Sequence, residues 1–144
     1  KDFKKFHPSG SLGTKLKTVE DIMLTNNKIP VIGENSTMKK ALKIITLKKL
    51  GTLIVQDSKK NIAGIITDGQ IRRINQKNKK LYDLTVKQVM TKNPIRVDKE
   101  MLAAKALSIM NEKKITSLCV INSFNIKKII GILHIHDLLQ NNID

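Results

Sequence analysis

The sequence is poor in the features of secreted and membrane proteins. Its 144 residues include a single cysteine, Cys119, which has no partner within the chain for a disulfide. Cys119 lies in the apolar run Leu118–Ile121 and is predicted to be a buried structural thiol. No run of 18 apolar residues occurs, and no secretory signal is visible. The sequence therefore predicts a cytoplasmic protein with no membrane partner.

Acidic residues are also scarce, since 12 of them stand against 27 basic residues and leave a net charge of +15. That balance by itself would indicate nucleic acid or another polyanion as a partner. The lysines, however, are spread in pairs such as Lys39-Lys40 and Lys113-Lys114 rather than gathered into one stripe. Aromatic residues make up 3% of the chain and do not alternate with basic runs, as a base-stacking surface requires. We predict a solvated lysine-rich surface and no nucleic-acid partner.

What the sequence does contain is an internal repeat. Three blocks recur in the same order: Val19–Met23 as Val86–Met90, Lys40–Ile44 as Lys105–Ile109, and Asn61–Ile66 as Lys128–Leu133. Nearly constant offsets with small slips indicate a duplicated unit whose loops differ in length. One copy alone would bury little surface. We therefore expect two copies packed about a pseudo-two-fold axis, with the cleft between them as a ligand site.

Each copy is predicted to have the order β-α-β-β-α, which makes the fold class α+β. Apolar periodicity in the first copy predicts a strand at 29–32, a helix with Ser36 as its N-cap, hairpin strands at 52–55 and 62–66, and a helix from about Asp68. The second copy repeats this with a strand at 95–97, a helix over 102–110, hairpin strands at 117–121 and 128–133, and a helix from Ile135. The predicted boundaries are 1–18 for a linker or the tail of an upstream domain, 19–75 and 86–144 for the copies, and 76–85 for a connector. Because the chain begins with Lys1, we expect further sequence upstream.

The first candidate site follows the third strand of copy one, in the segment 67–73. Thr67 as N-cap and Gln70 at the third helical position predict a capping box, which needs no ligand. A helix N-terminus after a strand also attracts anions, and Arg72 and Arg73 could pair with a phosphate. The two interpretations are compatible, and both stay open.

The corresponding point of copy two carries His134, His136 and Asp137. A His-x-His pair could belong to a metal site, but the chain has three histidines in all and no further cluster, so we expect no metal. Asp137 stands where Gln70 stands, and its carboxylate could bind a ribose diol or only cap the helix. A third segment, 7–13, could hold a sugar phosphate or serve as a linker. Because no catalytic constellation is visible in the repeats, we do not expect this chain alone to be an enzyme.

The two copies resemble a pair of CBS (cystathionine β-synthase) motifs, each with a methionine before its first strand and Gly-Ile-[Ile/Leu] in its third. More narrowly, the segments 6–13, 67–73 and 133–139 resemble the arabinose-5-phosphate isomerase family, in which a sugar isomerase (SIS) domain precedes the CBS pair. The resemblance implies an upstream domain that interconverts ribulose 5-phosphate and arabinose 5-phosphate for synthesis of Kdo, the acid sugar of lipopolysaccharide. This chain would then be its regulatory, ligand-sensing and dimerising module.

The resemblance also implies roles for particular residues and partners. His7 matches a histidine of the isomerase active site, so it would be catalytic only together with the missing domain. No cofactor is implied beyond an anionic effector, either an adenosine nucleotide or the nucleotide-sugar CMP-Kdo. Its expected ligand residues are Thr67, Asp68, Gln70, Arg72, Arg73, His134, His136 and Asp137. The other implied partners are the upstream domain and a second copy in a homodimer, with a tetrameric parent as an option.

One position departs from the family pattern. The family usually has aspartate where Gln70 stands, so the first cleft would lack a charged ribose acceptor. Two alternatives therefore remain, namely a stand-alone nucleotide-binding regulator and a purely structural dimerisation scaffold.

Overall fold

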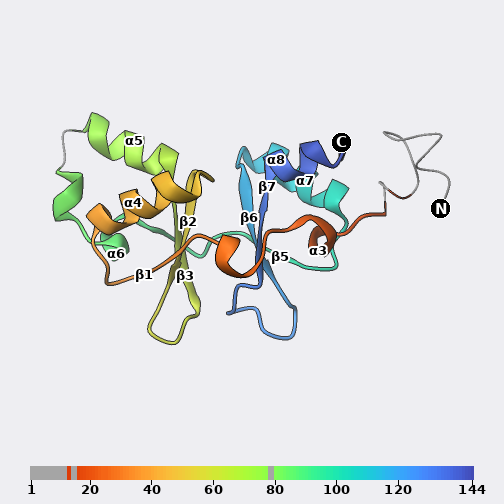
Figure 1. Ribbon diagram of the computed structural model, residues 1–144, viewed down its shortest axis with the longest axis horizontal. Coiled ribbons are helices and arrows are strands. Elements are labelled where there is room, and N and C mark those ends of the chain that lie inside the picture. Colours follow the sequence, from red (N-terminus) through yellow and green to blue (C-terminus); the bar gives the residue numbers. More distant parts are fainter. Residues whose placement is uncertain (1–12, 14–15, 78–79) are drawn as a thin grey trace. The chain divides into compact units, whose positions relative to one another are not determined.

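The computed structural model describes residues 13, 16–77 and 80–144. They form two compact units, each a sheet with helices packed against it (Figure 1). Unit 1 contains the described residues up to Asn26 together with Ile95–Asp144, and unit 2 contains Asn27–Pro94. No helix within these described ranges is long and apolar enough to cross a lipid bilayer.

Unit 2 is built on a four-stranded sheet in the order β1-β2-β3-β4. Strand β1 runs parallel to β2, and the other neighbours are antiparallel. The strands are β1 (Val31–Gly33), β2 (Thr52–Gln56), β3 (Ile62–Thr67) and β4 (Thr91–Lys92). The helices are α4 (Met38–Lys48), α5 (Asp68–Gln76) and α6 (Val86–Val89), with the short 3-10 helices η1 (Asn26–Lys28) and η2 (Leu81–Asp83). Strand β2 is buried along most of its length whereas β3 alternates, so β2 is the central strand of the core.

Unit 1 repeats part of this plan in a three-stranded sheet of order β5-β6-β7. Strand β5 (Arg96–Asp98) is parallel to β6 (Ser117–Ile121), which is antiparallel to β7 (Gly131–His134). Helices α7 (Ala103–Lys113), α8 (Ile135–Gln140) and the short α3 (Val19–Ile22) complete the unit. All five residues of β6 are buried, as expected for a strand covered on both faces.

The short segment that opens each repeat packs in the compact unit that holds the other repeat's strands. Leu24 pairs with Ile132 of β7, and the Met23 side chain lies directly over Gly131. In unit 2, β4 pairs with β3, and a Cβ added at Gly64 would lie 2.7 Å from the sulfur of Met90. Each compact unit therefore combines the opening segment of one repeat with the strands of the other repeat. The boundaries 19–75 and 86–144 remain a prediction about the repeated motif.

The order β-α-β-β-α is confirmed in both copies, and the strand residues 53–55 and 118–121 are buried as predicted. The predicted N-cap of α4 was wrong by one residue. Thr37 is the cap and accepts a hydrogen bond from the Lys40 N–H at 3.2 Å, while Ser36 belongs to the preceding turn. Strand β7 begins at Gly131 rather than at Lys128. The short elements α3, α6 and β4 escaped prediction because two to four residues show no periodicity.

Candidate functional site

The junction between β3 and α5 is the first candidate site, and its capping box is confirmed. The Thr67 N–H donates to Gln70 Oε1 at 2.8 Å, and the Gln70 N–H donates to Thr67 Oγ1 at 3.4 Å. Asp68, an exposed residue, donates its N–H to the carbonyl of Gly51 at 3.0 Å. Gly51 has φ +70°, and a Cβ there would lie 2.8 Å from Asp68 Oδ2. Only glycine therefore suits this turn beside the start of α5.

The side chain of Gln70 does more than cap its helix. Its Nε2 donates to Thr91 Oγ1 at 2.6 Å and to the Val89 carbonyl at 3.3 Å. One amide therefore joins the start of α5 to the end of α6 and the start of β4. A carboxylate could accept the bond from the Thr67 N–H but could not donate to these two oxygens. No motif or spacing indicates these partners, which lie 19 and 21 positions away along the chain.

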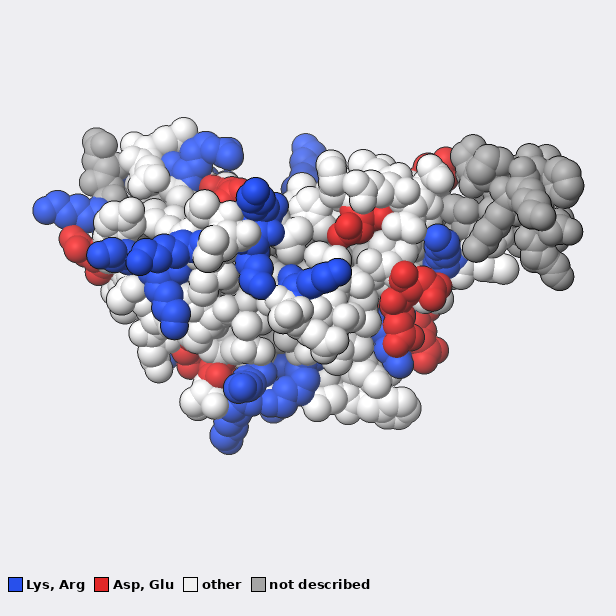
Figure 2. All heavy atoms as spheres, viewed as in Figure 1, with Lys and Arg blue, Asp and Glu red and all other residues white. Residues whose placement is uncertain are grey.

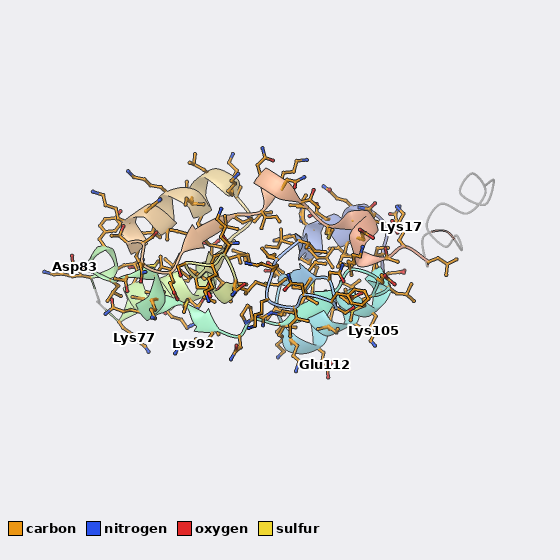
Figure 3. All side chains as sticks on the ribbon, turned by 90° about the horizontal axis from the view of Figure 1, so that it is seen from below. Lys17, Lys77, Asp83, Lys92, Lys105 and Glu112 are labelled. Atoms are coloured by element: carbon orange, nitrogen blue, oxygen red, sulfur yellow. The ribbon has the colours of Figure 1, made fainter. Side chains whose placement is uncertain are left out.

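A shallow hollow of about 250 Å³ opens beside this junction, entirely within unit 2. It is lined by Gln70, Arg73, Ile74, Lys77 and Val89. The Arg73 guanidinium folds back over the first turn of α5, since a Cβ at Gly69 would lie 3.3 Å from Arg73 Nη1. Lys77, labelled in Figure 3, is exposed, as is Arg72. The hollow thus runs along one face of α5, from Gln70 in the first turn to the C-cap Lys77, and combines an apolar floor with two cations that can pair with an anion.

The junction between β7 and α8 is the second candidate site and lies in unit 1. His134 is the N-cap of α8, and its Nδ1 accepts the His136 N–H at 3.1 Å. The two imidazole rings are 6.2 Å apart at 66°, an edge-to-face arrangement. His136 is exposed, and Asp137 is half-buried in the first turn of α8. The histidine pair is therefore held by a local cap, in which His134 is the N-cap of its helix as Thr67 is in copy one, but the bond spans two residues rather than three.

The structure thus groups five predicted residues at one junction and three at the other. Thr67, Asp68, Gln70, Arg72 and Arg73 belong to unit 2, and His134, His136 and Asp137 belong to unit 1. His7, the predicted catalytic residue, lies outside the described residues. Sequence reasoning missed Lys77 and Val89 of the hollow, because neither belongs to a recognisable motif.

Other groups in the described ranges offer little reactive chemistry. No group of three or more His, Cys, Asp or Glu residues there could hold a metal ion. Cys119 is fully buried, and burial raises the pKa of its thiol to about 12. The thiol is therefore neutral and shielded at physiological pH, as expected of a structural cysteine. Figure 2 shows the Lys and Arg side chains of this face in separate groups, with uncharged and acidic surface between them.

Comparison with protein families identifies the repeat. The model of the CBS domain matches residues 19–77 and again residues 86–143. Among curated proteins, arabinose 5-phosphate isomerase KdsD of Salmonella typhimurium is 40% identical over 140 residues, which is 96% of this chain. The chain spans 42% of the length of that relative.

Solved structures share the fold over most of the chain. CBSX2 in complex with AMP is 25% identical with a TM-score of 0.75, over 85% of this chain and 93% of that one. The CBS domain pair of protein MJ0100, in complex with 5′-methylthioadenosine and S-adenosyl-L-methionine, has a TM-score of 0.76. Its sequence is 22% identical, and the superposition covers 87% of this chain and 94% of that chain. This likeness concerns the fold alone.

Proposed function

Because the chain belongs to the CBS domain family, we propose that it is the regulatory module of an arabinose-5-phosphate isomerase. The observation that carries this proposal is the 40% identity to KdsD, which extends over 96% of the chain. The catalytic domain would precede this module, with residues 1–18 as the linker. His7 would enter the active site of that domain, where an imidazole can move protons near neutral pH.

The module senses an anionic nucleotide or nucleotide-sugar, with an adenosine nucleotide and CMP-Kdo as the candidates. Support comes from the exposed face of α5, where Arg73 and Lys77 border a hollow that extends from Gln70 to the C-cap of this nine-residue helix. A phosphate there would pair with both cations. In unit 1, the Asp137 carboxylate is the group that could accept hydrogen bonds from a ribose diol.

A thermal-shift and calorimetric screen tests the ligand. The probes are AMP, ADP, ATP, CMP, CMP-Kdo and arabinose 5-phosphate, each at millimolar concentration. A probe at 100 times its Kd stabilises the folded state by about 2.7 kcal/mol, so the Tm should rise by several degrees. Arg73→Ala and Asp137→Ala should reduce the shift. Lys59→Ala is the matched control, because Lys59 lies in the β2–β3 turn at the opposite end of β3 from α5 (Figure 1).

A purely structural dimerisation scaffold is the second candidate function. The observation in its favour is Gln70, whose amide bonds to Thr67, Thr91 and Val89. If no anionic probe shifts the Tm at millimolar concentration, the scaffold becomes the better description. Sedimentation equilibrium of the chain would then show a dimer with and without nucleotides.

The division of labour between the domains is tested by an isomerase assay. Purified residues 1–144 should not convert arabinose 5-phosphate into ribulose 5-phosphate, because the sugar-phosphate pocket is expected upstream. The full-length protein should do so, and His7→Ala in that protein should lower kcat by about 10²-fold or more. Turnover by residues 1–144 alone would contradict this division.

A further inference from the structure

The loop between β6 and β7, residues 122–130, displays the most exposed apolar side chain in the described part of the chain. Phe124 is 95% exposed and Ile126 is 57% exposed. Lys127, beside them, is also exposed, and Lys128 is half-buried. Figure 1 shows this loop at the end of β6 and β7 that lies opposite α8.

Hydrogen bonds from β5 fix the loop, so the exposure of Phe124 belongs to a defined conformation. Asp98 Oδ1 accepts the Ser123 N–H at 2.7 Å, and Arg96 Nε donates to the Ile126 carbonyl at 3.0 Å. Asn122 Oδ1 accepts the Phe124 N–H at 3.1 Å. A side chain presented on a pre-ordered loop loses less entropy when it binds than one on a loose loop.

The apolar tip is specific to the second repeat. The equivalent pairs Val55 with Gly64 and Val120 with Gly131 enclose eight residues in the first hairpin and ten in the second. The first loop turns through the polar residues 57–60, Asp-Ser-Lys-Lys. The two additional residues therefore accompany a change from a polar turn to one that carries Phe124 and Ile126.

The size and charge of this tip restrict what can cover it. Burying Phe124 and Ile126 would contribute about 3–6 kcal/mol before the costs of association. Two side chains supply far less area than the roughly 1,200 Å² typical of a stable interface between free proteins. A second copy would also bring the same lysines against Lys127 and Lys128. The tip therefore fits an apolar pocket bordered by carboxylates on a partner that is held close by covalent linkage.

The chain enters the molecule in the same unit as this loop. The Val19 N–H donates to the Met101 carbonyl at 2.8 Å, and Leu24 pairs with Ile132, the residue after Gly131 in β7. Eighteen residues ahead of Val19 span at most about 60 Å, so a domain attached through them stays near unit 1 at a millimolar effective concentration.

We propose that the Phe124–Lys128 tip docks into an apolar, carboxylate-bordered pocket on the domain that precedes this chain. This inference rests on the proposed function, which supplies that domain as the isomerase. The contact would couple the regulatory module to the catalytic domain, because a change in unit 1 would then reach the isomerase through the tip.

Hydrogen exchange of the full-length protein tests the contact on the partner's side. Phe124→Ser should raise amide exchange about tenfold in one surface patch of the upstream domain, because the patch loses its cover. The matched control Leu47→Ser removes another exposed apolar side chain, 77% exposed on α4, and should leave that patch unchanged. Equal exchange in wild type and Phe124→Ser would overturn the inference.

A charge-reversal variant provides a second test of the contact in the same hydrogen-exchange experiment. Lys127→Glu with Lys128→Glu should also expose the patch, because carboxylates would then face carboxylates. Isomerase turnover is measured on the same samples. A full-length protein without isomerase activity defeats the proposed function, whereas an active enzyme with an unchanged exchange map defeats only the docking contact.

Discussion

Two glutamines of this chain occupy the third position of a capping box, and only Gln70 reaches a second element. Gln88 Oε1 accepts the Thr85 N–H at 2.8 Å, the same bond that Gln70 makes to Thr67. Gln70 alone also donates to Thr91 and to the Val89 carbonyl. The pair thus separates the contribution of a cap from that of a tertiary bridge.

Replacing both glutamines by alanine measures that difference. Gln88→Ala should lower the free energy of unfolding by about 0.5–1 kcal/mol, the usual range for a cap. Gln70→Ala should cost about 1 kcal/mol more, because two further hydrogen bonds are lost. Urea unfolding of both variants gives the two values. Gln70→Glu should restore the cap without the bridge, and equal costs for both alanine variants would contradict the bridging role.

At the scale of elements, the contacts Met23–Gly131 and Met90–Gly64 pack the segment that opens each repeat against a sheet. The nearest obstacle to a Cβ at Gly131 is the flexible Met23 side chain, with the Leu24 carbonyl at 3.1 Å. At Gly64 the Met90 sulfur and the Thr91 carbonyl are both 2.7 Å away. Crowding by a movable side chain and crowding by backbone should therefore respond differently to a second substitution.

Double variants distinguish these two situations. Gly131→Ala and Gly64→Ala should each destabilise the protein by about 1–3 kcal/mol. Adding Met23→Ala should recover part of the loss in Gly131→Ala, beyond the sum of the single effects. Adding Met90→Ala should recover little in Gly64→Ala, because the Thr91 carbonyl still blocks the methyl group. Thermal unfolding of the four variants and of the two methionine controls provides the comparison.

The anchoring of the 122–130 loop should depend on pH. The Glu100 N–H donating to Asp98 Oδ2, helped by bonds from Ser123, holds the pKa of Asp98 below its usual value. A carboxylate with a depressed pKa stabilises the folded state above its unfolded pKa of about 3.9, and this contribution is lost as the pH falls through the folded pKa. Asp98→Asn should therefore reduce stability at pH 6, and the difference from wild type should shrink below about pH 4. A difference independent of pH would show that the charge of Asp98 contributes nothing.

At the scale of the whole molecule, unit 2 is one continuous stretch of chain, Asn27–Pro94, whereas unit 1 is assembled from two stretches. The fragment 27–94 should thus unfold cooperatively, although a unit of this size is marginal. The fragment 19–75 should not, because it carries α3 without β7 and exposes Gly64 without Met90. Thermal melts followed by circular dichroism compare the two, and a cooperative transition in 19–75 alone would reverse the assignment.

The sequence predicted what is local and repeated. The order β-α-β-β-α and the Thr67–Gln70 capping box follow from periodicity and spacing, and both are confirmed. The partner of each methionine could not be predicted. Met23 and Met90 occupy equivalent positions of the repeat, so the pattern allows either one to cover either glycine. Tertiary contacts determine which methionine covers which glycine, and they also determine the hydrogen bond from Gln70 to Thr91.

The pairing of Leu24 with β7 also determines the order in which the two units can fold during synthesis of the chain. The segment Val19–Leu24 leaves the ribosome before unit 2, but β7, its pairing partner, is made more than a hundred residues later. Unit 2 is complete as soon as Pro94 has emerged. The bond from Lys17 Nζ to Asn141 Oδ1, between residues 124 positions apart, can form only when the last helix has been made. A nascent chain halted before Gly131 should therefore carry a folded unit 2 between two unfolded flanking segments, and the segment Val19–Leu24 would be open to proteases until β7 has been made.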